Sequence, residues 1–197
     1  MWSRAMVLGA AASLAACGDV QTSASDASSR DVVCGAQPVE VLPNGSFDAS
    51  TPPWTQDPVT PSLLCGMPGI TPADGTTAAC LGGTDGLVQT MSQTVKLPAG
   101  VKNLTLTGQI CIDTAETVAT ANDTLVFDVL GGTTAISTLG TKSNQQGAHP
   151  CVFSAFTFTA PITSDPVTAT FRFTSTLNNT MPTSFYVDKL SLTATCN

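Results

Sequence analysis

Charged side chains are scarce in this sequence. They make up 11% of its 197 residues, with 14 acidic against 7 basic residues and a formal net charge of −7. A protein that binds nucleic acid needs basic side chains to neutralise phosphates, so this balance excludes nucleic acid as a partner. The chain has one histidine, His149, and two glutamates, Glu40 and Glu116, and it contains neither a GxSxG nor an HExxH motif. We therefore expect no enzyme, and a hydrolase that uses His149 is the least favoured alternative.

Long apolar runs are absent except near the N-terminus. Arg4 precedes an apolar stretch from Ala5 to Leu14, which is shorter than the roughly 20 residues that a membrane-spanning helix needs. A positive start, a short apolar stretch and small residues before a cleavage point predict a signal peptide over residues 1–16.

The four residues that end this stretch, Leu-Ala-Ala-Cys at positions 14–17, resemble the lipobox of bacterial lipoproteins. The resemblance implies cleavage before Cys17 and attachment of a diacylglycerol to its sulfur, which would anchor the protein to a membrane. An ordinary signal peptide with an incidental cysteine is the alternative. Residues 17–31 are mainly small and polar, so we expect a lipidated N-terminus followed by a disordered tether. Gly18 follows the cysteine where an inner-membrane lipoprotein of enteric bacteria has Asp, which favours the outer membrane or cell surface.

Six cysteines follow Cys17, and none of them forms a CxxC motif. An even number in an exported chain predicts disulfides rather than a zinc or redox site, although the sequence leaves several connectivities open. The strand neighbourhood favours three pairs: Cys34–Cys196, Cys65–Cys80 and Cys111–Cys151.

The hydropathy pattern of residues 32–197 is that of β-strands. Apolar residues alternate with polar ones, mainly threonine, in three clear runs, and Gly- and Pro-rich turns separate the runs. The alternating residues are Leu104, Leu106, Gly108, Ile110 and Ile112; Leu125, Phe127 and Val129; and Val167, Ala169, Phe171 and Phe173. Many short strands predict one all-β domain, a two-sheet antiparallel β-sandwich of the jelly-roll type that disulfides crosslink.

The alternation changes phase within the last predicted strand. Phe185 and Val187 share one parity, whereas Leu190 and Leu192 share the other, so we expect a β-bulge at Asp188 and Lys189. A bulge there would leave a carboxylate and free carbonyl groups at the rim of the core, which is a suitable place for a structural cation.

Several motifs, taken in order, resemble the galactose-binding-like jelly rolls of carbohydrate-binding modules. The motifs are Asn-Gly-Ser-Phe-Asp at 44–48 followed by Trp54, Ala-Cys-Leu-Gly-Gly-Thr-Asp-Gly at 79–86, Leu-Pro-Ala-Gly at 97–100, and Phe-Tyr-Val-Asp-Lys-Leu-Ser-Leu at 185–192. The resemblance implies that the first and last strands are neighbours and that a structural calcium lies between them, held by Asp48 and Asp188. Two departures bear on this calcium: Asp48 replaces the more usual Glu, and Lys189 occupies a second acidic position, where its charge would make the ion unnecessary.

The resemblance also implies a glycan ligand. Modules of this family often bind sugars with exposed Trp or Tyr rings, and Trp54 is the candidate here; the alternative is that Trp54 caps the sandwich. Tyr186 is expected to be structural. The resulting prediction is a lipid-anchored, non-catalytic module that binds glycan, and the alternative is a structural or protein-interaction lipoprotein of the envelope with no sugar ligand.

Overall fold

The computed structural model describes residues 37–66, 71–117, 120–164 and 166–196. The predicted signal peptide, Cys17, the tether over residues 17–31 and Cys34 lie outside the described residues. Within those ranges, no helix has the length and apolar character that crossing a membrane would require.

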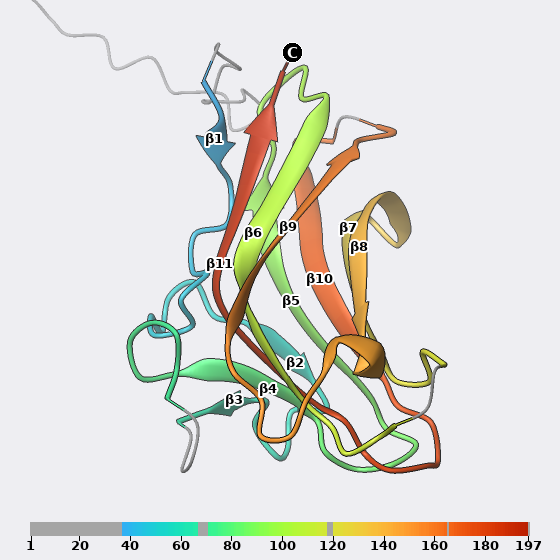
Figure 1. The fold of residues 1–197 in the computed structure, drawn as a ribbon. Helices are drawn as coiled ribbons and strands as arrows, with labels where there is room; N and C mark the ends of the chain where they lie inside the picture. Colours follow the sequence, from blue (N-terminus) through green and yellow to red (C-terminus); the bar gives the residue numbers. More distant parts are fainter. Residues whose placement is uncertain (1–36, 67–70, 118–119, 165, 197) are drawn as a thin grey trace, which may run out of the picture.

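Two antiparallel sheets form the domain, one in front of the other in Figure 1. The six-stranded sheet runs β3-β4-β11-β6-β9, and β1 also pairs with β11. Its strands are β1 (Val39–Glu40), β3 (Leu64–Cys65), β4 (Ala78–Gly82), β6 (Asn103–Asp113), β9 (Ser154–Pro161) and β11 (Ser184–Thr195). The five-stranded sheet runs β2-β5-β10-β7-β8. Its strands are β2 (Thr55–Asp57), β5 (Val88–Lys96), β7 (Thr124–Gly131), β8 (Thr134–Ser143) and β10 (Thr168–Thr176). A short 3₁₀ helix, η1 (Asn144–Gln146), follows β8. The predicted two-sheet jelly-roll sandwich is confirmed.

The period-two pattern explains how the sheets pack. In β6, Leu104, Leu106 and Ile110 are almost fully buried, while the threonines between them are half-buried on the other face. Each strand therefore contributes one apolar face to a core between the two sheets. Val167 departs from the prediction, because it precedes β10 and is 43% exposed.

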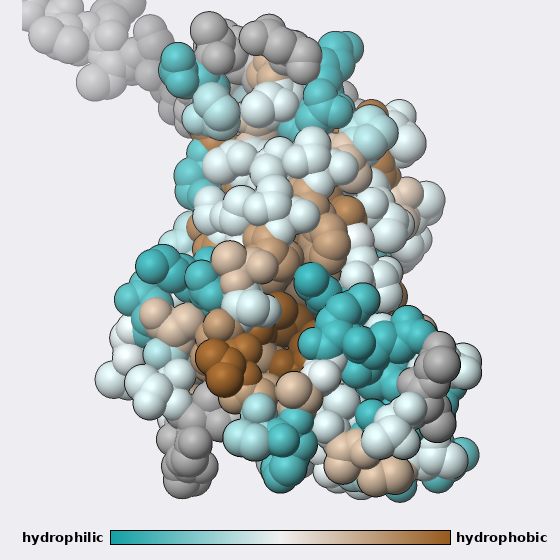
Figure 2. Space-filling view, viewed as in Figure 1, coloured by the Kyte–Doolittle hydropathy of each residue, from teal (hydrophilic) through white to brown (hydrophobic). Residues whose placement is uncertain are grey.

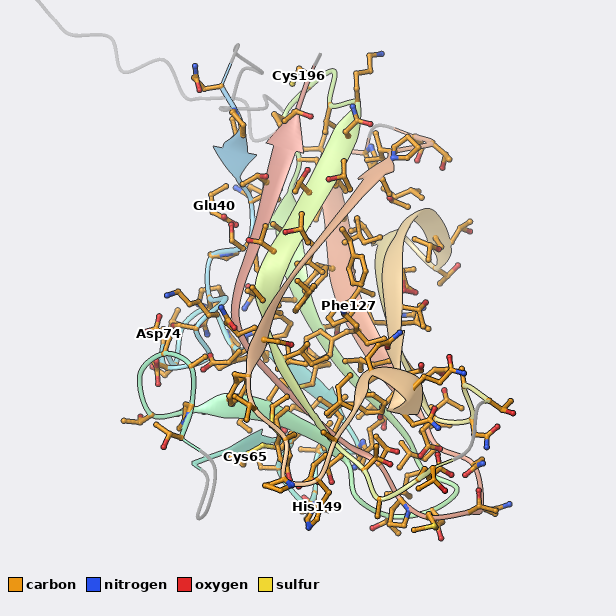
Figure 3. All side chains as sticks on the ribbon, viewed as in Figure 1. Glu40, Cys65, Asp74, Phe127, His149 and Cys196 are labelled. Atoms are coloured by element: carbon orange, nitrogen blue, oxygen red, sulfur yellow. A yellow bond between two sulfur atoms is a disulfide. The ribbon has the colours of Figure 1, made fainter. Side chains whose placement is uncertain are left out.

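Aromatic rings fill the centre of the core. Phe127, labelled in Figure 3, lies 5.4 Å from Phe156 and 5.6 Å from Phe173 between ring centroids. Phe173 in turn lies 5.5 Å from Trp54. These contacts join both sheets and the segment before β2 into one apolar cluster.

Two disulfides crosslink the six-stranded sheet and its neighbouring loops. They join Cys65 to Cys80 and Cys111 to Cys151, with Cα atoms 6.1 and 5.5 Å apart. Both are pairs that the sequence analysis favoured. Cys196 is also disulfide-bonded, but Cys34 lies outside the described residues, so the Cys34–Cys196 pair stays a prediction. Disulfides of this kind are typical of exported proteins.

The bulge predicted in the last strand is confirmed. The pairing of β11 with β6 shifts register between Asp188 and Ser191, and Lys189 has a φ of 52°. Tyr186, just before the bulge, pairs with Cys80 on one side and Cys111 on the other. Its half-buried ring thus lies between the two disulfides, which supports the structural role expected for it.

Candidate functional site

A groove runs along one edge of the sandwich, between the segment that contains β1 and the end of β5. Its volume is about 400 Å³, within the range of small-molecule sites. The groove is lined by Val39, Glu40, Val41, Leu42, Pro43, Pro52, Thr94, Val95 and Lys96. Apolar side chains and proline rings thus make most of its wall, and three polar residues complete it.

The groove exists because β5 is longer than its neighbour β2. Within β5, only Thr90, Met91 and Ser92 pair with β2. The rest of β5, through Lys96, therefore extends beyond the end of β2. The alternation along β5 turns Thr94 and Lys96 outward, and both are exposed. Their side chains are therefore available to a ligand in the groove.

The opposite wall of the groove is fixed to the six-stranded sheet by Glu40. Its Oε1 accepts hydrogen bonds from the backbone N–H groups of Leu42 (2.9 Å) and Leu192 (3.0 Å). Its Oε2 accepts one from the hydroxyl of Ser191. Glu40 thus joins the groove wall to β11, and both of its oxygens already have protein donors.

Two buried amide side chains fix the wall at Pro52. Asn44 Nδ2 and Gln93 Nε2 donate to the Pro52 carbonyl at 3.1 and 3.2 Å, and both residues are 3% exposed. Asn44 also donates to Ala49 at 2.7 Å. The wall is therefore held before any ligand arrives, which lowers the entropic cost of binding.

Beyond the groove, the outward face of the five-stranded sheet is polar. Thr94 pairs with Thr170, and the next outward row contains Ser92, Arg172 and Asp128. Arg172 Nη2 lies 2.5 Å from Asp128 Oδ2. Asp128 is buried, so this row offers the Ser92 hydroxyl and the part-exposed guanidinium of Arg172 next to the groove.

Trp54, the candidate sugar-binding ring, is not displayed at the surface. Trp54 is 6% exposed, its Nε1 donates to the Asn44 carbonyl at 2.8 Å, and its ring contacts Phe47 and Phe173. A ring in this position cannot stack on a sugar. It caps the core beneath the groove wall, which is the alternative that the sequence left open.

Asp188 and Asp48 both lie at the bulged edge of β11, where the calcium was expected. Asp188 is fully buried, and its oxygens accept the backbone N–H groups of Asp74 at 2.8 Å and Lys189 at 2.6 Å. Burial raises the pKa of Asp188, while these amides and that of Ala73 act in the opposite direction. Asp48 is exposed, and its Oδ1 accepts the N–H groups of Thr76 at 2.9 Å and Thr77 at 3.1 Å.

Calcium binding needs six to eight oxygen ligands, drawn from carboxylates, carbonyl groups and waters. Three of the four carboxylate oxygens of these two residues are already stabilised by backbone N–H groups. Among the described residues, no group of three or more His, Cys, Asp and Glu side chains is placed to hold a metal. The contacts of Asp48 and Asp188 therefore do not fit a calcium site.

His149 lies at the end of the sandwich, away from Glu40 and the groove (Figure 3). Its Nδ1 is 2.7 Å from Asp113 Oδ1, and its side chain is 69% exposed. In the part of the chain that the structure describes, no serine, threonine or cysteine side chain is hydrogen-bonded to this ring. The pair lacks the nucleophile that a catalytic triad requires.

The visible face of the six-stranded sheet carries a second, smaller hollow. Figure 2 shows that most of this face has intermediate hydropathy and that apolar residues gather in its lower half. A hollow there, lined in part by Ile110, Lys142, Gln146 and Val152, has a volume of about 60 Å³. This is far below the volume of ordinary ligand sites.

Sequence reasoning missed the groove residues Pro52, Thr94 and Lys96. The outward positions of Thr94 and Lys96 followed from the strand alternation, but any strand on a solvent face has such positions. The groove depends on how far β2 extends along β5, and no local sequence motif predicts the length of that pairing.

No protein-family model matches the sequence, and no curated protein is similar enough to match it. Among solved structures, the chain is similar to the carbohydrate-binding module TmCBM61, solved in complex with β-1,4-galactotriose. The TM-score is 0.52 and the identity 14%, over 78% of this chain and 97% of that one. It is also similar to the enzymatically active domain of tailspike protein 4 from bacteriophage CBA120, with a TM-score of 0.52 and 11% identity over 79% of this chain. That match spans only 21% of the tailspike chain.

A family 4 carbohydrate-binding module matches with a TM-score of 0.46 and 18% identity, over 77% of this chain and 97% of that one. The match to TmCBM61 shows that the fold is a jelly-roll sandwich like that of this module.

Proposed function

We propose that this protein is a non-catalytic module that binds glycan in the groove between β1 and β5. The observation that carries the proposal is the groove itself: about 400 Å³ of partly apolar space with two exposed polar side chains, Thr94 and Lys96, at its open side. A sugar has both apolar C–H faces and a rim of hydroxyl groups, and the groove offers a partner for each.

The polar groups of the groove divide into fixed and available ones. Glu40 is occupied by hydrogen bonds to β11, whereas Thr94 and Lys96 extend from the free end of β5. A hydroxyl and an ammonium group can donate to ring and hydroxyl oxygens of a sugar. A longer glycan would continue across the outward face of the five-stranded sheet, toward Ser92 and Arg172.

Similarity of fold supports this proposal from a second direction. TmCBM61, whose fold this chain shares over most of its length, was solved with a β-1,4-linked galactotriose bound. The two proteins are 14% identical, so the likeness favours the ligand class and says nothing of which sugar this chain prefers.

Affinity electrophoresis of the full chain in gels that contain neutral or acidic polysaccharides tests the proposal. We expect at least one polysaccharide to retard the wild type, and Thr94→Ala with Lys96→Ala to weaken retention about tenfold, equivalent to about 1.4 kcal/mol. Thr157→Ala, an exposed change on β9 in the other sheet, is the matched control and should bind like the wild type. If no polysaccharide retards the wild type, the proposal fails. A protein partner captured from envelope extracts without sugar competition would then favour the structural alternative.

We also propose that the module is exported and held at the outer membrane or cell surface by a lipid on Cys17. The lipobox-like residues 14–17 support the anchor, and the disulfides support export. Metabolic labelling with an alkyne-tagged palmitate should mark the wild type and leave Cys17→Ala unlabelled. An unprocessed Met1 terminus found by mass spectrometry in cells would contradict the anchor.

A further inference from the structure

The edge of β11 that faces β1 and β4 is interrupted at the bulge. β4 pairs with Ser184–Val187 and β1 with Thr193 and Ala194, which leaves residues 188–192 between them without a strand partner on this side. Two chain segments cover the gap. Gly45 accepts a hydrogen bond from the N–H of Leu190 at 2.8 Å, and the loop of residues 73–77 lies against Asp188 and Asp48.

The loop of residues 73–77 presents its backbone N–H groups to the two carboxylates. Asp74 donates to Asp188, while Thr76 and Thr77 both donate to Asp48. The Thr76 hydroxyl adds a third hydrogen bond to Asp48, at 3.3 Å. Each carboxylate thus binds the same loop from a different part of the chain, one from the segment after β1 and one from the last strand.

Glycine lies at the point of closest approach, where a side chain would displace the carboxylate of Asp48. Gly75 has a φ of 53°, and a Cβ atom there would overlap the carboxylate of Asp48. The loop therefore comes against the carboxylate with its backbone, as anion-binding turns do. Asp74 points its own carboxylate at the N–H of Gly75 (3.0 Å), which further fixes the turn.

We propose that this loop replaces the calcium ion that the resemblance implies, so that the first and last strands are joined by a metal-free clasp of Asp48, Asp188 and residues 73–77. An N–H group and a cation both stabilise a carboxylate, so the amides of this loop can supply the stabilisation that an ion would otherwise give. The side chain of Lys189 is exposed, and its backbone N–H, rather than its charge, takes part in the clasp.

Thermal unfolding of the full chain in millimolar calcium chloride and in excess EDTA tests the clasp. A calcium ion that binds the folded protein, at a free concentration of about 100 times its Kd, would raise Tm by about 5 to 10 °C for a chain of this size. We expect the two Tm values to agree within about 1 °C.

Two substitutions at the exposed Asp48 separate an N–H acceptor from a calcium ligand. Asp48→Asn keeps an acceptor oxygen, whereas Asp48→Ala removes it. We expect Asp48→Ala to lower Tm by about 2 to 4 °C and Asp48→Asn by less, equally in calcium and in EDTA. Asp85→Ala, at another exposed aspartate, should leave Tm unchanged.

A calcium-dependent rise in the wild type that Asp48→Asn abolishes would overturn the proposal, because it would identify Asp48 as a ligand of the ion. A rise that persists in Asp48→Asn and Asp48→Ala places the ion elsewhere and leaves the clasp as proposed. Equal Tm values for Asp48→Ala and the wild type would also overturn it, since the loop would then not depend on this carboxylate.

Discussion

Two strand edges of the sandwich are interrupted, and the protein treats them in opposite ways. At β11 the gap between β1 and β4 is closed by Gly45, the loop of residues 73–77 and the buried Asp188. At β5 the part beyond β2 remains open and forms the groove. Unpaired edges are a hazard for aggregation, so an edge that is left open calls for a use.

One segment connects the two edges. Its first part, residues 39–43, lines the groove, and its second part, residues 45–48, closes the gap at β11. Glu40 belongs to both, because it lines the groove and accepts a hydrogen bond from Leu192 of β11. The closed edge thus holds the wall of the open one. Along this single stretch of chain, residues 39–43 contribute to the groove and residues 45–48 contribute to stability.

Gly45→Ala should break the closed edge with the largest effect on stability. A Cβ at Gly45 would overlap the backbone carbonyl of Leu190, which cannot move without disturbing β11. We expect a loss of about 3 kcal/mol in the free energy of unfolding, measured by urea denaturation. Gly100→Ala is the control: it has a φ of 80° but no atom near the added methyl group, so strain alone should cost about 1 kcal/mol. Equal losses in the two variants would show that the gap at β11 is not tightly closed.

Trp54→Phe should have the next largest effect, and it acts beneath the groove. The change keeps an aromatic ring in the core but removes the donor to the buried Asn44 carbonyl, so we expect a loss of about 2 kcal/mol in urea denaturation. Retention by a polysaccharide that binds the wild type should be unchanged, because Trp54 does not line the groove. A variant that is stable but no longer retained would return Trp54 to the binding surface.

Much of the fold followed from the sequence because its signals are local. The alternation in β6, the phase change at Asp188 and the turn-forming glycines each act over a few residues. The site did not follow in the same way. The two prolines before Trp54 left both a displayed and a capping position open. Its burial depends on Phe47 and Phe173, which are distant in sequence from each other.

The calcium expectation also shows that contacts between distant parts of the chain are hard to predict from sequence. The positions of Asp48 and Asp188 at one strand edge were anticipated, whereas the partner of each carboxylate was not. That partner is a loop that binds mainly through backbone N–H groups, which carry no side-chain signature. Within it, a side chain at Gly75 would overlap Asp48.

Asp188→Asn should produce a smaller effect that depends on pH. Burial raises the folded-state pKa of Asp188 above the ordinary value of 3.8, so its charged form is less favourable in the folded state than in the unfolded state. The stability of the wild type, relative to Asp188→Asn, should therefore be greatest below pH 3.8 and decrease as the pH rises through the folded-state pKa. Urea denaturation of both proteins at a series of pH values checks this. If the two curves of stability against pH run parallel, the pKa of Asp188 does not change on folding.

The smallest effect on stability is expected at the open edge. Thr94→Ala and Lys96→Ala change exposed side chains at the end of β5, so each should alter the free energy of unfolding by less than about 0.5 kcal/mol. The same two changes are expected to weaken glycan retention about tenfold. A loss of stability comparable to that of Gly45→Ala would show that the groove wall supports the fold, and the contrast between the closed and open edges would disappear. Because one segment connects both edges, binding and stability must be measured on the same variants to separate a role in glycan binding from a role in stabilising the fold.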